Sequence, residues 1–360
     1  MPRPQPSRGR RDEDLAAGAA KPTLQTIATL TGLAVATVSR ALANAPEIAV
    51  GTRGRVQRVA AEIGYLPNRA AQRLRTGRTN VISLVLDPHD ELLGFGTSLV
   101  SGITAALRDT PYQLIITPHF ADVPSIDPVR YILRHRMADG IIFSRTEPLD
   151  PRVRLLIEHG FPFVCHGRTE LSTPHPYVDF DNYAFAYEAT RRLIDKGRER
   201  LAIILPPRRF TFCQHLQHGF MTAVREAGVA FEIPGGIDLD SPAEDIRQFV
   251  ASRDARTGPD GYVCSGEVSA LAVMAGLTDR GLSIGKDVDL VAKQTSRLFG
   301  QIRPRIETIY EDITAAGEIM GRLVLERIAD RKVDELQHLQ KPDVTRESAS
   351  RKWPALQSGA

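Results

Sequence analysis

The hydrophobic pattern near the start of the chain predicts three short helices. Apolar side chains recur at helical spacing over residues 24–30, over residues 35–43, and from about residue 52 to residue 63. Thr23 is the expected N-cap of the first helix, and Gly32 interrupts the pattern between the first two. Two short helices joined by a brief turn containing Gly are typical of a helix-turn-helix, whose second helix enters the major groove of DNA.

The outward positions of the second predicted helix suit contacts with DNA. Arg40 can donate two hydrogen bonds to a guanine. Val35 and Ala36 can contact a thymine methyl group, and Thr37 and Ser39 can bind phosphate. A three-helix bundle with a solvated face has the same pattern and is the alternative.

From residue 81 the pattern changes to short apolar runs that alternate with amphipathic segments. Continuous apolar strands separated by helices indicate parallel sheets covered on both faces. We therefore expect an all-α head followed by an α/β body with two parallel-sheet subdomains. The predicted strands cover residues 81–86, 113–117, 140–143, 161–165, 201–205, 261–264 and 289–292. The predicted helices cover residues 97–107, 182–196, 217–227 and 268–280.

Polar side chains directly after these strands are candidate ligand contacts, because open parallel sheets bind ligands beyond the carboxyl ends of their strands. Donors and acceptors occur together there, and an aromatic ring such as Phe95, Phe210 or Phe212 could stack on a sugar. Loop residues present only for solubility are the alternative, and Phe95 and Phe210 could equally belong to the core. The candidates after strands are His89, Asp90, Ser144, Arg145, His166, Arg168, Phe210, Ser265, Glu267, Lys293 and Gln294.

Composition excludes several classes of protein. The chain has 360 residues, which predicts more than one domain, and no run approaches the ~20 apolar residues that span a bilayer. Three cysteines far apart, with no CxxC pair, predict neither a zinc site nor a disulfide framework. Known catalytic motifs are not found, so we expect no enzyme activity, no cofactor and no metal. Residues 1–20 do not resemble a secretory signal and are expected to form a disordered arm of a cytoplasmic protein.

Charge is distributed unevenly along the chain. Residues 1–80 hold 13 Lys and Arg against 5 Asp and Glu, a net charge of +8, whereas the remaining residues hold 33 against 38, a net charge of −5. A basic head on a mildly acidic body indicates that the head meets a polyanion. We therefore expect double-stranded DNA as the partner of the head.

The head and the residues after it resemble the LacI/GalR repressor family. The resemblance rests on TLQTIATLTGLAVATVSRALA (residues 23–43) and TRGRVQRVAAEIGYLPNRAAQRLRTGRT (residues 52–79). It implies a head over residues 21–66, a hinge helix and linker over residues 67–80, and a leucine, Leu74, that wedges into the minor groove. The DNA contacts implied are Thr23, Val35, Ala36, Thr37, Ser39, Arg40, Thr52, Asn68, Arg69, Ala71 and Leu74.

Two positions of the head depart from the family pattern. The family usually has Ser where this chain has Ala34, in the turn, and again where it has Ala49, before the third helix. Each replacement removes a hydroxyl that caps a helix or binds phosphate, and a lost cap costs about 1 kcal/mol. We expect DNA binding to persist with a different affinity and sequence preference.

The resemblance extends through the body, over residues 81–340, and implies a periplasmic-binding-protein-like fold. YVDFDNYAFAYEATRRLIDKGRERLAIIL (residues 177–205) matches the family well and implies that Asp179 lies near the crossing between subdomains. Two positions that usually grip the effector are instead Leu216 and Gln294. His166, Arg168, Lys293 and Gln294 are the expected replacements, and their surroundings resemble the branch that regulates α-glucoside utilisation.

These features predict a repressor that binds a palindromic operator as a homodimer, with a small sugar-type effector controlling its affinity. The tail over residues 341–360 has no heptad pattern, so a tetramerising coiled coil is not expected. Two alternatives remain: a periplasmic-type sugar-binding protein, which would need a signal peptide, and an activator or dual regulator.

Overall fold

The computed structural model describes residues 21–66, 73, 76–87, 92–120, 122–254 and 256–343, without the side chains of residues 92 and 93. They form two compact units that divide between Arg78 and Thr79. Several predictions lie outside the described residues: the arm over residues 1–20, the tail from residue 344, and the candidates Asn68, Arg69, Ala71, Leu74, His89 and Asp90.

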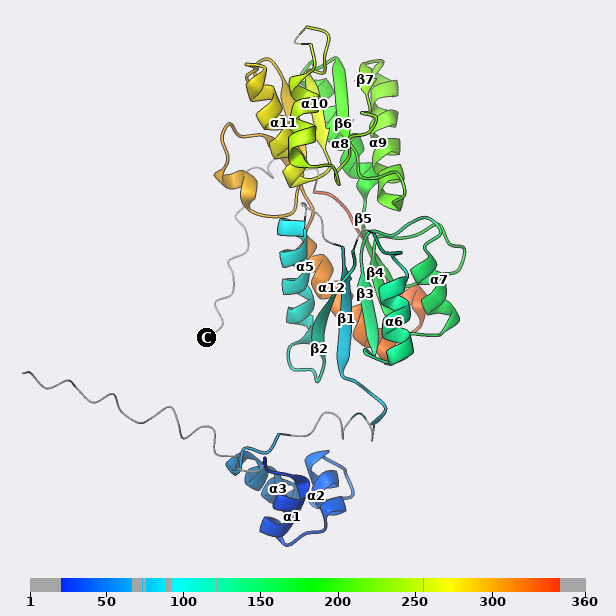
Figure 1. The fold of residues 1–360 in the computed structure, drawn as a ribbon, viewed down its shortest axis with the longest axis vertical. Coiled ribbons are helices and arrows are strands. Elements are labelled where there is room, and N and C mark those ends of the chain that lie inside the picture. Colours follow the sequence, from blue (N-terminus) through cyan, green and yellow to red (C-terminus); the bar gives the residue numbers. More distant parts are fainter. Residues whose placement is uncertain are drawn as a thin grey trace, which may run out of the picture. The chain divides into compact units, whose positions relative to one another are not determined.

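The first unit contains the three predicted helices, α1 (Leu24–Thr31), α2 (Val35–Leu42) and α3 (Val50–Glu62) (Figure 1). Their inward faces form one small core, in which Ile27, Val38 and Val56 are fully buried. This core fixes which face of α2 remains outside, because burial of Val38 and Ala41 turns the opposite positions to the surface.

The helix ends of the head follow the sequence predictions. Thr23 caps α1 in a capping box with Thr26, and Gly32 ends α1 in the left-handed conformation at φ 67°. Ala34 and Ala49 stand at the N-cap positions of α2 and α3, where they make no side-chain cap.

The second unit begins with a six-stranded parallel sheet in the order β11-β5-β4-β3-β1-β2. Alternate strand residues face opposite layers of helices: Ile82 and Leu84 pack against α5 and α12, whereas Ile141 and Phe143 pack against α6 and α7. We call this the first subdomain. Its elements are β1 (Val81–Leu86), α5 (Leu92–Leu107), β2 (Gln113–Pro118), α6 (Asp127–His135), β3 (Gly140–Phe143), α7 (Pro151–Glu158), β4 (Phe163–His166), β5 (Tyr177–Phe180), α12 (Ile313–Ile328), η2 (Val333–Glu335) and β11 (Gln337–Gln340).

The second subdomain is a five-stranded parallel sheet in the order β10-β9-β8-β6-β7. Leu201 and Ile203 face α8 and α9, whereas Ala202 and Ile204 face α10 and α11. Its elements are α8 (Asn182–Asp195), β6 (Arg200–Ile204), α9 (Thr211–Ala227), β7 (Ala230–Glu232), α10 (Ala243–Ala251), β8 (Gly261–Cys264), α11 (Glu267–Asp279), β9 (Asp289–Gln294), η1 (Leu298–Gln301) and β10 (Glu307–Tyr310).

All seven predicted strands exist, with bounds that shift by a few residues. The predicted helix over residues 217–227 was too short, because α9 begins at Thr211. The strands β5, β7, β10 and β11 were not predicted as strands, since each is short and its apolar residues are interrupted or flanked by a charged or amide side chain.

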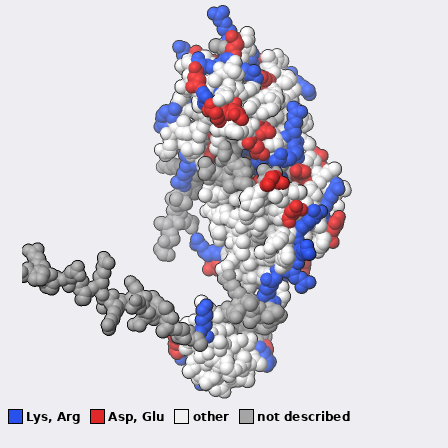
Figure 2. Space-filling model, in the orientation of Figure 1, with Lys and Arg blue, Asp and Glu red and all other residues white. Residues whose placement is uncertain are grey.

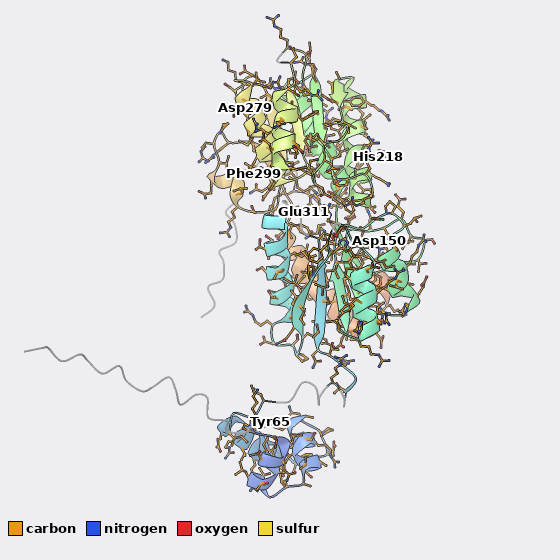
Figure 3. The ribbon with its side chains drawn as sticks, viewed as in Figure 1. Tyr65, Asp150, His218, Asp279, Phe299 and Glu311 are labelled. Atoms are coloured by element: carbon orange, nitrogen blue, oxygen red, sulfur yellow. The ribbon has the colours of Figure 1, made fainter. Side chains whose placement is uncertain are left out.

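Within the described residues, the chain passes between the subdomains at Asp181 and again at Glu311–Asp312. The two passages are built alike: Asp181 caps α8 by accepting a hydrogen bond from Ala184 N, and Asp312 caps α12 by accepting one from Ala315 N. Glu311 lies between the two sheets (Figure 3). Side chains near these passages are therefore held in common by both subdomains.

Close packing of α5 on α12 holds the first subdomain together. A Cβ atom on Gly102 of α5 would lie 2.0 Å from the Thr314 carbonyl oxygen, so only Gly allows the two helices to approach this far.

On the face drawn in Figure 2, acidic and basic side chains of the body are intermixed. Among the described residues no helix is long and apolar enough to cross a membrane.

Candidate ligand cavity and DNA-binding helix

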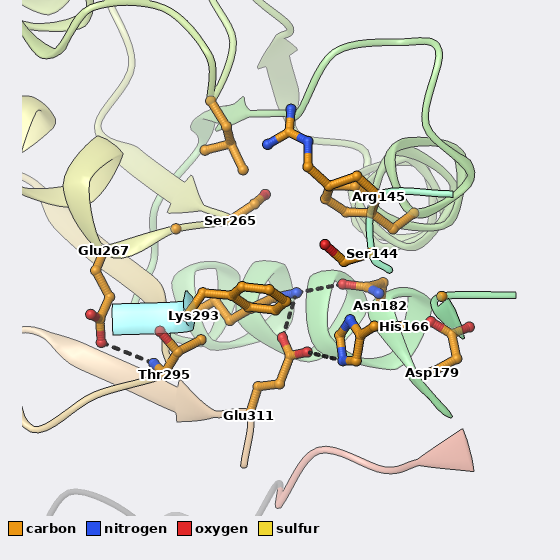
Figure 4. A pocket seen from close by; sticks show the side chains of 15 residues that line it. Ser144, Arg145, His166, Asp179, Asn182, Ser265, Glu267, Lys293, Thr295 and Glu311 are labelled. Carbon is orange, nitrogen blue, oxygen red and sulfur yellow. Dashed lines mark hydrogen bonds and ion pairs between the residues drawn. The ribbon is translucent and has the colours of Figure 1, made fainter. Parts of the chain in front are cut away.

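A cavity opens between the two subdomains, with about 740 Å³ of space that includes the open solvent at its entrance. Its wall combines aromatic and aliphatic faces with charged and hydroxyl groups from both sheets (Figure 4). The lining residues are Phe95, Ser144, Arg145, His166, Gly167, Asp179, Asn182, Phe212, Leu239, Ser265, Gly266, Glu267, Lys293, Thr295 and Glu311.

Lys293 is the buried cation of this cavity. It lies on β9, and its Nζ donates to Asn182 Oδ1 at 2.5 Å and pairs with Glu311 Oε2 at 3.0 Å (Figure 4). The same ammonium group lies over the rings of Phe180 and Phe185, at 4.9 and 5.2 Å from their centroids. A buried charge requires such partners, because an unpaired ammonium in the interior would be strongly unfavourable.

His166 follows β4 and faces the same carboxylate. Its Nε2 lies 3.7 Å from Glu311 Oε1, beyond a direct hydrogen bond, and its ring meets Phe95 edge-on. Burial lowers the pKa of His166, and Lys293 lowers it further, against the opposing effect of Glu311. The imidazole is therefore neutral near pH 7 and can donate one hydrogen bond and accept another.

Asp179, on β5, is a buried carboxyl group with an unusual pKa. Its Oδ1 accepts a hydrogen bond from Phe180 N, and its Oδ2 lies 3.0 Å from Arg168 Nε without hydrogen-bond geometry. Burial raises the pKa of Asp179 to about 6, although Arg168 lowers it. An ionisable group that lines a cavity and has a strongly shifted pKa is typical of a ligand-binding site.

Arg145 joins the two subdomains beside the cavity, and Glu267 lies where they approach each other. Arg145, which follows β3 at φ 57°, donates to Asp240 of the second subdomain at 2.6 Å. Glu267, at the start of α11, accepts hydrogen bonds from the backbone of Thr295 and Ser296. A Cβ on Gly94 of α5 would lie 2.8 Å from Glu267 Oε2, so α5 approaches this carboxylate closely. Residues of both subdomains thus meet beside the cavity.

The arrangement can hold a hydroxylated small molecule. Neutral His166 and the carboxylate of Asp179 supply donors and acceptors, while Phe95 and Phe212 supply ring faces. Among the described residues no group of three His, Cys, Asp or Glu could hold a metal ion.

In the head, α2 presents the predicted DNA-binding face. Val35, Ala36 and Arg40 are exposed, and Thr37 and Ser39 are half-exposed. The Arg40 side chain is 56% exposed, and its ion pair with Glu47, at 4.0 Å, is too long and too exposed to hold it. Thr52 lies half-buried in the first turn of α3.

Comparisons with known proteins agree with both parts. The model of the bacterial regulatory proteins of the lacI family matches residues 23–68, and that of a periplasmic binding protein-like domain matches residues 190–349. The HTH-type transcriptional regulator AglR of Rhizobium meliloti is 33% identical over 277 residues, which cover 75% of this chain and 76% of the relative. The chain belongs to the lacI family of bacterial regulatory proteins.

Further relatives of this lacI-family regulator match most of its length. The HTH-type transcriptional regulator CelR of Thermobifida fusca is 28% identical over 318 residues, covering 86% of this chain and 92% of the relative. A structure of a CelR–cellobiose complex covers 90% of this chain and 98% of its own, at 26% identity and a TM-score of 0.64. A lac repressor dimer bound to operator and the anti-inducer ONPF shares the fold, with 19% identity, a TM-score of 0.76, and coverage of 90% and 97%.

Nine predicted ligand-contact positions of this regulator line the cavity. They are Phe95, Ser144, Arg145, His166, Asp179, Phe212, Ser265, Glu267 and Lys293. Three others do not. Arg168 pairs with Asp179, Gln294 bonds to Ser296 and Thr308, and Phe210 is buried beneath the guanidinium groups of Arg145 and Arg209, in agreement with its alternative assignment to the core.

Sequence reasoning missed several lining residues, of which Asn182 and Glu311 are the most central. Both hold Lys293, yet neither follows a predicted strand: Asn182 begins α8, and Glu311 follows the short strand β10. Leu239 and Thr295 were also missed. The Asp-Asn pair at residues 181–182 was the available signal for Asn182.

Proposed function

We propose that this protein is a repressor that binds a palindromic operator as a homodimer, and that a sugar bound between its subdomains controls its affinity for that operator. The observation that carries the proposal is the combination, in one chain, of an exposed DNA-binding face on α2 with a cavity that both subdomains line. Double-stranded DNA as the partner implies a cytoplasmic, nucleoid-associated protein.

The operator contacts follow from α2. Arg40 donates to a guanine, Val35 and Ala36 meet a thymine methyl group, and Thr37 and Ser39 position the helix on phosphates. One small head buries little DNA surface, so two heads on a palindrome are needed for useful affinity. The relative solved as a lac repressor dimer on its operator supports this arrangement.

The sugar is proposed to be an uncharged glucoside, with α-glucosides first. Three ionised groups that line the cavity already have partners of opposite charge: Lys293 pairs with Glu311, Arg145 with Asp240, and Asp179 with Arg168. A neutral ligand leaves those pairs intact, whereas a phosphate would place a new charge beside three carboxylates. The related structure with cellobiose supports a disaccharide-sized glucoside.

Control requires that the sugar favour one of two forms of the body, because a ligand with equal affinity for both shifts nothing. We propose that the closed subdomains of the sugar-bound form release the operator.

The test is binding of the purified full-length protein to the DNA upstream of its own gene, with and without a panel of glucosides and sugar phosphates. A specific complex that one glucoside dissolves supports the proposal. Absence of any specific complex at low and moderate salt refutes DNA control. A specific complex that no sugar changes refutes the effector alone. A reporter fused to the same DNA separates repression from activation, because deletion of the regulator raises expression only if it represses.

A further inference from the structure

Asp139 fastens the segment through which the chain enters the body. Its Oδ1 accepts hydrogen bonds from Thr79 N at 2.8 Å and from Thr79 Oγ1 at 2.9 Å, and its Oδ2 accepts one from Asn80 N at 2.8 Å. The Asn80 carbonyl oxygen in turn accepts from Gln113 N at 2.9 Å. These contacts begin at the first residue of the body, immediately after the division between the two units.

The buried strand β3 connects Asp139 to the wall of the cavity. Asp139 precedes β3, all four residues of β3 are buried, and Ser144 and Arg145 follow it in the cavity wall. Strand β3 is hydrogen-bonded on both sides, to β1 and to β4. It therefore holds Asp139 and Arg145 at a fixed separation.

The second subdomain contains a similar arrangement of hydrogen bonds, made by Asp260 to a segment that does not lead to the head. Asp260 also precedes a Gly that starts a buried strand, β8, and its Oδ1 accepts from Glu199 N at 3.1 Å and from Arg200 N at 2.9 Å. The Glu199 carbonyl oxygen accepts from Ala230 N at 2.9 Å, as Asn80 does from Gln113. Here the fastened segment is only the turn between α8 and β6.

We propose that Asp139 is a positioning residue for DNA binding: it fixes the body end of the linker over residues 67–80, and coupling between the cavity and the heads depends on it. The inference rests on the proposed function. Loss of the carboxylate removes three hydrogen bonds from Thr79 and Asn80, which loosens the body end of the linker and lowers the effective concentration of the second head at its half-site. A loosened end also transmits less of any movement of the body.

The test compares Asp139→Asn with Asp260→Asn in the full-length protein. In Asp139→Asn an amide NH₂ group replaces a carboxylate oxygen and cannot accept from a backbone N–H, whereas in Asp260→Asn it replaces the oxygen that faces Arg200 and the remaining Oδ1 still accepts from Glu199 N and Arg200 N. Three quantities are measured: affinity for the DNA upstream of its own gene, the fold-change in that affinity on adding cellobiose or maltose, and the affinity of the free protein for the same sugar.

For Asp139→Asn we expect affinity for that DNA to fall by about tenfold or more and the sugar-induced fold-change to shrink toward one, with sugar affinity unchanged. For Asp260→Asn we expect all three quantities to remain within about twofold of wild type. Equal effects of the two variants on DNA binding and on the sugar response, or no effect of either, would overturn the proposal.

Thr79→Val is the milder second variant, which keeps the backbone hydrogen bond of Thr79 to Asp139 and removes the two contacts of the hydroxyl, with Asp139 Oδ1 and with Val81 N. This variant keeps the proposal testable if Asp139→Asn does not fold. We expect it to reduce the sugar-induced change in DNA affinity, to a smaller extent than Asp139→Asn. An unchanged sugar response would refute the proposal. Failure of the proposed function itself is recognised separately, since the wild-type protein would then form no specific DNA complex.

Discussion

Arg145 of the first subdomain, which lines the cavity, donates to Asp240 of the second at 2.6 Å. The Arg145 side chain is only 10% exposed, and a backbone hydrogen bond from Thr211 N to Thr146 O, at 2.9 Å, crosses between the subdomains nearby. Because Arg145 and Asp240 lie on different subdomains, their contact depends on how the two subdomains are placed.

We therefore predict that Asp240→Asn weakens sugar binding by about five- to twentyfold, which corresponds to ~1–2 kcal/mol for a partly buried charge pair. The loss should occur mainly in the dissociation rate, measured by stopped-flow mixing, because the variant opens more readily. Arg209→Ala is the control: Arg209 also pairs with Asp240, at 3.5 Å, but is 60% exposed and should matter less than twofold. Equal effects of the two variants would contradict the prediction.

Asp179→Asn is expected to stabilise the protein while weakening sugar binding. The pKa of Asp179 rises to about 6 in the folded protein from 3.8, so ionising it near pH 7.5 costs up to ~3 kcal/mol of folding free energy. Asn carries no charge and avoids that cost, but it lacks one acceptor oxygen for a sugar hydroxyl. Thermal melts and calorimetric titration with a glucoside measure the two effects.

The pH dependence of that difference has a definite sign. A carboxyl group with a raised folded pKa contributes stability that is complete below about pH 3.8 and is lost as pH rises through about 6. The melting temperature of Asp179→Asn should thus exceed that of wild type most at pH 7.5 and approach it near pH 4. A variant less stable than wild type at pH 7.5 would show that the carboxylate stabilises the fold.

Arg40→Ala should remove sequence-specific DNA binding more than non-specific binding. A bidentate contact with guanine discriminates by ~1–3 kcal/mol, whereas a phosphate contact acts on every sequence alike. Fluorescence anisotropy with the upstream DNA and with a scrambled duplex gives the ratio. Arg58→Ala, at an exposed position of α3, is the control and should leave the ratio unchanged. A parallel loss on both duplexes would assign Arg40 to phosphate.

Gly102→Ala should destabilise the body by about 3 kcal/mol, since the new Cβ would overlap the Thr314 carbonyl oxygen and force α5 away from α12. Urea unfolding measures the loss. Ser101→Ala, an exposed neighbour in the same helix, is the matched control and should change stability by less than about 0.5 kcal/mol. A body that tolerates both substitutions equally would show that the two helices can separate without loss.

The amino-acid sequence determined the secondary structure of the head and most of that of the body. Apolar residues at helical spacing, among them Ile27, Val38 and Val56, specify the helices that form the core of the head. Apolar runs such as residues 81–86 specify buried strands. Both signals are local in the sequence. Short strands with polar neighbours, such as β10 and β11, carry no such signal and acquire strand geometry only by pairing with β9 and β5.

The cavity was predictable only where a residue directly follows a strand. Ser144, Arg145 and His166 were found in this way, since the ends of parallel strands share one edge of a sheet. Which of Lys293 and Gln294 faces the cavity depends on the pleat and register of β9, and Glu311 reaches Lys293 only because the chain passes between the subdomains there. Sequence determined which elements form; the tertiary structure decided which charges meet, because the partners of a buried charge are set by packing between segments that are distant along the chain.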